Sequence, residues 1–113
     1  MLAPLALSAV MSLAGQEPVR LMSYDEVVRC AGLTQAASEL EGGESGEGRT
    51  LYDAALYWSL TAIQAAQTTA RPAVASEDDQ TRARIRAVRE LSAENPEARA
   101  ALQRCRARTP DLG

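Results

Sequence analysis

The sequence predicts a small all-α domain, a four-helix bundle made of two antiparallel helical hairpins and closed by one disulfide bond. Patterns that begin and end helices recur four times along the 113 residues, whereas the alternation typical of strands is missing. The chain contains two cysteines, Cys30 and Cys105. A chain of this length forms a single domain, which is small enough to profit from a covalent cross-link.

The N-terminal segment resembles a signal peptide. Residues 1–14, MLAPLALSAVMSLA, carry no charged side chain and are fewer than the roughly 20 residues that cross a bilayer as a helix. Small residues at Ser12 and Ala14 predict cleavage after Ala14, which leaves residues 15–113 as the mature domain without a transmembrane span. We therefore expect a periplasmic or secreted protein. The alternative is a buried or frayed N-terminal helix.

The first helix is expected over residues 24–41. Ser23 and Glu26 have the spacing of a capping box, in which each side chain accepts a hydrogen bond from the other residue's backbone amide. A glycine-rich loop then ends the helix, and its shortness predicts an antiparallel hairpin with the next one. Apolar spacing predicts one buried face, formed by Val27, Cys30, Thr34, Ala37 and Leu40.

The second helix is expected over residues 46–70, where Arg71 and Pro72 end it. It is apolar over most of its circumference, which predicts the central position in the bundle. Tyr52 and Tyr57 lie on opposite faces, so these two residues and Trp58 cannot all be buried. An aromatic residue left at the surface either borders the core or anchors a partner, and we take Tyr57 and Trp58 as candidate partner-binding residues.

The last two helices are expected over residues 77–93 and 96–107. Ser76 would cap the third helix, with acidic residues in its first turn, and Asn95 with Pro96 would start the fourth. Their predicted inward faces are formed by Thr81, Ile85, Val88 and Leu91 in the third helix, and by Ala98, Ala101, Leu102 and Cys105 in the fourth.

A disulfide between Cys30 and Cys105 is expected because both residues fall on inward faces, one in the first helix and one in the last. Closing so long a loop stabilises a fold by about 4.5 kcal/mol in the chain-entropy model. The alternative is two buried free thiols in a cytosolic protein. The two cysteines lack Cys-x-x-Cys spacing, and a zinc site built on several cysteines would need more of them.

Charge is unevenly distributed along a chain whose net charge is −3. Most carboxylates precede Arg82, and most arginines lie from Arg82 onwards. Arg82, Arg86 and Arg89 follow one face of the third helix, and we consider two roles for them: internal ion pairs, or docking of an acidic partner or an anionic polymer. Nucleic acid is not expected as a partner, because the chain is acidic overall and carries no known nucleic-acid-binding motif.

Enzymatic chemistry is not expected either. Without histidine the chain has no imidazole base, no histidine-dependent triad and no usual haem or zinc site. We therefore predict no catalytic residues, no metal and no cofactor. The sequence favours an exported protein that acts by protein–protein binding, as an accessory subunit, an inhibitor or a chaperone-like module. The alternative is a small-ligand carrier or weak hydrolase that uses a pocket between helices.

Overall fold

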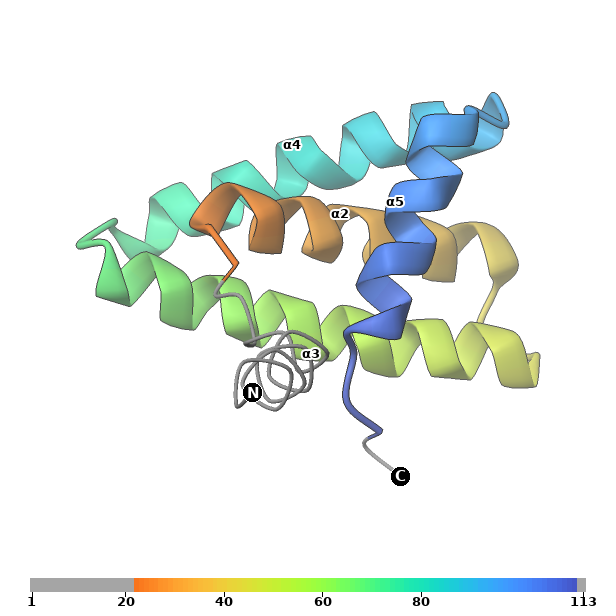
Figure 1. Ribbon diagram of the computed structural model, residues 1–113, viewed down its shortest axis with the longest axis horizontal. Helices are drawn as coiled ribbons and strands as arrows, with labels where there is room; N and C mark the ends of the chain where they lie inside the picture. Colours follow the sequence, from red (N-terminus) through yellow and green to blue (C-terminus); the bar gives the residue numbers. More distant parts are fainter. Residues whose placement is uncertain (1–21, 112–113) are drawn as a thin grey trace, which may run out of the picture.

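The computed structural model describes residues 22–111, which form four α-helices (Figure 1). No strand occurs within this range, so the all-α prediction is confirmed. The predicted signal peptide, residues 1–14, and its cleavage after Ala14 lie outside the described residues. The helices are α2 (Tyr24–Glu41), α3 (Gly46–Thr68), α4 (Ala73–Ser92) and α5 (Pro96–Ala107).

Side-chain caps fix where three of these helices begin. The capping box predicted at the start of α2 is present: Ser23 Oγ accepts from the Glu26 amide, and Glu26 Oε1 accepts from the Ser23 amide, both at 3.1 Å. At the start of α3, Ser45 Oγ accepts from the amide of Gly48 at 2.9 Å, without a reciprocal bond. Asn95 caps α5, which then starts with the expected proline.

The start of α4 differs from the prediction. The helix begins at Ala73 with Pro72 as its N-cap, because the Pro72 carbonyl already accepts from the amides of Ala75 and Ser76. Ser76 is therefore not a cap. It is fully buried inside α4, where its hydroxyl accepts from Gln80 Nε2 at 3.2 Å.

The central helix is α2, not α3 as the apolar circumference of α3 predicted. Figure 1 shows α2 between α3 and α4, with α5 crossing one face of this layer. The chain runs through α3 antiparallel to α2, as expected for the first hairpin. The second predicted hairpin does not form, because α5 turns across the layer after a short connection in which Glu94 has a positive φ of 56°.

Close packing of small residues explains why α2 occupies the centre. Gly32 of α2 faces Ala83 of α4, and a Cβ atom added at Gly32 would lie only 2.5 Å from the Ala83 carbonyl carbon. The two backbones thus approach as closely as a glycine permits. This contact turns the small side chains of α4 inward, including Ser76 and Ala87, both 0% exposed.

The predicted core face of α4 is consequently wrong in part. Thr81 is exposed and Ile85 is 46% exposed, whereas Val88 and Leu91 are half-buried against the core. In α2, Leu40 was also expected inside but is 52% exposed near the end of the helix. Large side chains in the middle of α4 have no room where α2 and α4 pack through alanine, serine and glycine.

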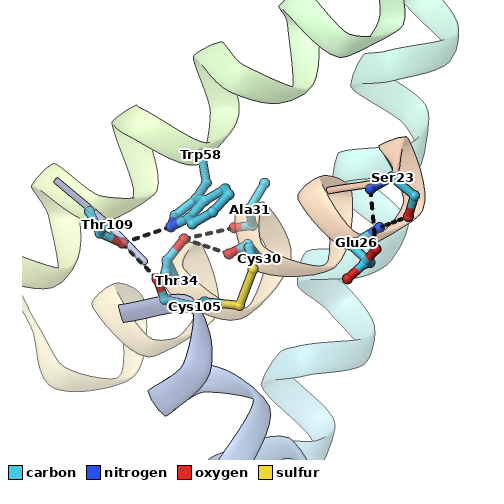
Figure 2. Close-up of a disulfide and its surroundings, with 8 residues drawn as sticks. All are labelled: Ser23, Glu26, Cys30, Ala31, Thr34, Trp58, Cys105 and Thr109. Atoms are coloured by element: carbon cyan, nitrogen blue, oxygen red, sulfur yellow. Dashed lines mark hydrogen bonds between the residues drawn. A yellow bond between two sulfur atoms is a disulfide. The ribbon is translucent and has the colours of Figure 1, made fainter. Parts of the chain in front are cut away.

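The disulfide between Cys30 and Cys105 is present and links α2 to the last turn of α5 across 75 residues. The two Cα atoms are 5.5 Å apart, within the usual range for a disulfide. Beside this bond, the indole of Trp58 donates from Nε1 to Thr109 Oγ1 at 2.8 Å (Figure 2). Thr109 in turn donates to the Cys105 carbonyl, so the largest core side chain is tied to the end of α5.

Candidate functional site: the exposed apolar face of α3

The edge position of α3 leaves part of its apolar circumference uncovered. Tyr52, Leu56, Leu60 and Ile63 are 57%, 46%, 62% and 38% exposed. Their spacings of four, four and three residues place them on one side of the helix. The buried residues of α3, among them Leu51, Trp58 and Ala62, occupy the opposite side. We call the four exposed residues the α3 stripe.

The surroundings of the α3 stripe are polar but mostly uncharged. Residues 54–70 contain no charged side chain. A shallow cleft of about 260 Å³ runs beside Tyr52 and Leu56, between α2 and α3. In this cleft Gln35 donates to Ser59 Oγ at 2.6 Å. An apolar centre with aromatic character, few charges and a polar rim is the usual composition of a protein–protein interface.

The predicted aromatic anchors occupy different environments. Trp58 is 2% exposed and hydrogen-bonded inside the molecule, so its side chain does not reach the surface. Tyr57 is half-buried and meets Trp58 edge to face, with ring centroids 5.0 Å apart. The exposed aromatic residue of α3 is Tyr52, which we had not chosen. Its spacing relative to Leu56, Leu60 and Ile63 is the signal in the sequence that could have identified it.

Two of the three arginines that we considered for docking on α4 have internal partners. Arg82 pairs with Asp79 at 2.8 Å, and Arg86 pairs with Glu90 at 3.4 Å. Arg89 is exposed and forms no ion pair with any residue in the range 22–111. Internal pairing therefore accounts for Arg82 and Arg86, while a role of the three arginines in docking remains a prediction.

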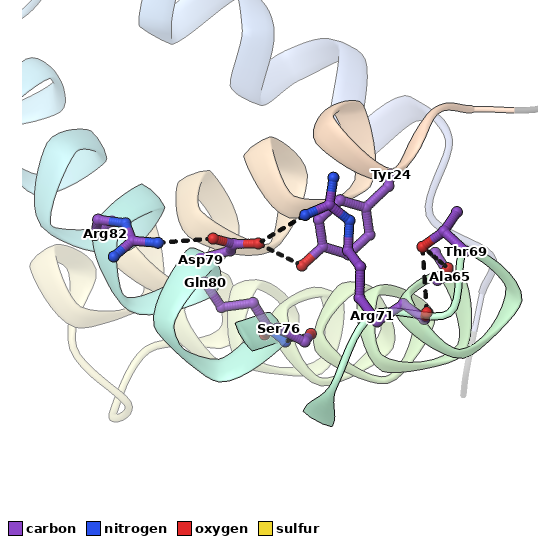
Figure 3. A network of polar contacts seen from close by, with 9 residues as sticks. Tyr24, Ala65, Thr69, Arg71, Ser76, Asp79, Gln80 and Arg82 are labelled. Atoms are coloured by element: carbon purple, nitrogen blue, oxygen red, sulfur yellow. Dashed lines mark hydrogen bonds and ion pairs between the residues drawn. The ribbon is translucent and has the colours of Figure 1, made fainter. Parts of the chain in front are cut away.

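Asp79 is the hub of a polar network that joins α4 to the start of α2 (Figure 3). It accepts from the hydroxyl of Tyr24 at 2.7 Å and from Arg82 at 2.8 Å, and Arg71 lies 3.9 Å away. The hydrogen bond from Tyr24, followed by the bond and charge of Arg82, lowers the pKa of Asp79. Burial, then the bond to Asp79, raises the pKa of Tyr24. Arg71 also covers the Tyr24 ring, 4.4 Å from its centroid, so the network is structural.

A second carboxylate is held in a similar way. Arg29 of α2 donates to Glu90 of α4 at 2.8 Å. Although burial alone would raise the pKa of Glu90, the hydrogen bond and charge of Arg29, together with Arg86, lower it. Both networks fasten α4 to α2.

The described residues were also compared with the requirements of a metal site and of a membrane-spanning helix. Between residues 22 and 111 no group of three or more His, Cys, Asp or Glu side chains is arranged to hold a metal ion. Among the same residues, no helix combines the length and hydropathy needed to cross a bilayer.

Comparison with known proteins gives no relative. The chain matches no protein-family model, no curated protein and no solved structure.

Proposed function

We propose that the protein acts by protein–protein binding and that the α3 stripe is its docking surface. One observation carries the proposal: four large apolar side chains are exposed in a row on one helix. Contiguous apolar patches on soluble proteins commonly mark interaction sites. Tyrosine supplies a large contact area with a polar end, which suits the centre of an interface.

We further propose an oxidising compartment, the periplasm or the extracellular space, for this interaction. The Cys30–Cys105 bond supports that location, because disulfides persist in exported proteins and are rare in the cytosol.

A ligand carrier or hydrolase fits the geometry less well. A cleft of about 550 Å³ beside Trp58 is open to solvent, and its lining mixes apolar side chains with Thr61, Gln64 and Arg108. Carriers instead enclose most of the ligand in a largely apolar pocket. Across residues 22–111, every buried side-chain nitrogen and oxygen atom already has a hydrogen-bond partner, so none is left pointing at a ligand.

The test is cross-linking and capture of the tagged full chain in its own host. Leu60→Glu places a charge in the α3 stripe. Val74→Glu on α4 is the matched control, since Val74 is 65% exposed and Leu60 is 62% exposed. We expect the cross-linked partner to be recovered with the wild type and with Val74→Glu, and to be lost with Leu60→Glu. Equal recovery with both variants would show that the stripe is not the docking surface.

A second experiment tests whether the arginines on α4 contact the partner. Changing Arg82, Arg86 and Arg89 together to Glu reverses the charge of that face of α4. If an acidic partner also touches this face, the triple variant weakens capture and removes much of its salt dependence. If recovery is unchanged, the arginines serve the fold alone. Thermal unfolding of each variant verifies that the domain is still folded.

A further inference from the structure

We infer that the occupant of the α3 stripe is a second copy of this chain, which packs its own α3 antiparallel against the first. This inference rests on the proposed function, because it names the partner of the same surface.

The exposed side of α3 follows the repeat of a coiled coil. Six exposed residues alternate at spacings of four and three, which is the spacing of a coiled-coil seam, and the apolar residues that such a seam requires are the central three, Leu56, Leu60 and Ile63. At 1.5 Å per residue this seam is about 27 Å long. Its members, which we call the α3 seam, are Arg49, Asp53, Leu56, Leu60, Ile63 and Gln67.

The α3 seam can face a reversed copy of itself in register. Its midpoint lies between Leu56 and Leu60, so a two-fold axis there brings Leu56 opposite the partner's Leu60. The same axis brings Arg49 opposite the partner's Gln67, whose amide oxygen can accept from the guanidinium. An isologous contact of this kind is the commonest form of oligomer interface.

Charge disfavours the parallel orientation. In a parallel pair each seam residue meets its own copy, so Arg49 would face the partner's Arg49, and Asp53 the partner's Asp53. Like charges at facing positions disfavour that arrangement. In the antiparallel pair both charged residues face uncharged ones, the partner's Gln67 and the partner's Ile63.

The size of the surface predicts a weak dimer. Stable interfaces bury about 800 Å² on each partner, whereas the α3 seam is one helix face with three apolar residues and Tyr52 beside them. We therefore expect a dissociation constant in the micromolar range and a dimer that forms at high concentration.

The experiment is sedimentation velocity of the purified full chain from low micromolar to near-millimolar concentration. We expect the apparent mass of the wild type and of Val74→Glu to rise from that of a monomer towards twice that value. Leu60→Glu should remain monomeric throughout. A wild type that is monomeric at every concentration, or a dimer that survives Leu60→Glu, overturns the inference.

Orientation is tested by mixing Leu56→Cys protein with Leu60→Cys protein under mild oxidation. The antiparallel seam predicts a cross-link between the two variants, whereas a parallel seam would join each variant to itself and overturn the assigned geometry.

The proposed function and the inference of self-association can fail separately. If the wild type is monomeric but Leu60→Glu still abolishes capture of another protein, only the inference of self-association fails; if Leu60→Glu changes neither measurement, both fail.

Discussion

The two antiparallel helices α2 and α3 differ in how much of their circumference is buried. In α2 the consecutive residues Ala31, Gly32, Leu33 and Thr34 are all buried, and four residues at 100° steps cover the whole circumference of a helix. In α3 the buried residues occupy one side, and large apolar side chains occupy the other. The contrast indicates that small side chains favour the central position of α2, since Gly32 lets the backbone of α4 approach closely.

The largest expected effect comes from removing the bond that holds α5 over α2. Replacing Cys30 and Cys105 together by alanine should lower the free energy of unfolding by about 4 kcal/mol, since the unfolded chain is no longer restricted. Urea unfolding measures this change. Reduction of the wild type is the control and should give a similar loss. A change below about 1 kcal/mol would mean that packing alone holds α5 in place.

Leucine truncation compares the two helices directly. Leu33 of α2 is fully buried, whereas Leu60 of α3 is 62% exposed. We expect Leu33→Ala to cost about 3 kcal/mol, because it leaves a cavity, and Leu60→Ala to change stability by less than about 0.5 kcal/mol. Thermal and urea unfolding at low protein concentration measure both without a contribution from association. Equal costs would contradict the assignment of α3 to the edge.

A methyl group tests the close approach of α2 to α4. In Gly32→Ala the new Cβ meets the backbone of Ala83, so the helices must separate. We expect a loss of about 2 kcal/mol, because overpacking outweighs the gain of about 1 kcal/mol in helix propensity. Gly43→Ala is the matched control, since nothing lies within 4 Å of a Cβ at Gly43. Stabilisation by Gly32→Ala would contradict this expectation and show that α4 can move away from α2 at little cost in free energy.

Local patterns predicted the helices better than their arrangement. The capping box at Ser23, the cap at Asn95 and the inward positions of the two cysteines are short-range features, and the structure contains all of them. The central position of α2 was not predictable in this way. It depends on the contact between Gly32 and Ala83, two residues far apart in the sequence.

The candidate site was missed for the same reason. The apolar circumference of α3 was interpreted as a sign of burial, whereas its placement at the edge exposes Tyr52 and Leu60. The residues chosen for binding were selected by chemical type. Of these, Trp58 belongs to the core, and Arg82 and Arg86 have internal partners.

The smallest expected effect concerns acid, and it sharpens how α2 is held by α4. Because Tyr24 and Arg82 lower the pKa of Asp79 below its ordinary 3.8, the unfolded chain takes up this proton more readily than the folded one. The ionised Asp79 carboxylate therefore contributes its full stabilisation above about pH 5, and this contribution is lost as the pH falls through the folded-state pKa of Asp79. Asp79→Asn should lower the free energy of unfolding at neutral pH and reduce the loss of this free energy at acid pH, which we call the acid limb. Part of the acid limb should persist in this variant, because the pKa of Glu90 is also lowered. Asp78→Asn is the control for net charge, since Asp78 is exposed. An acid limb that is equally steep in both variants would show that the bond from Tyr24 to Asp79 does not hold α4 on α2.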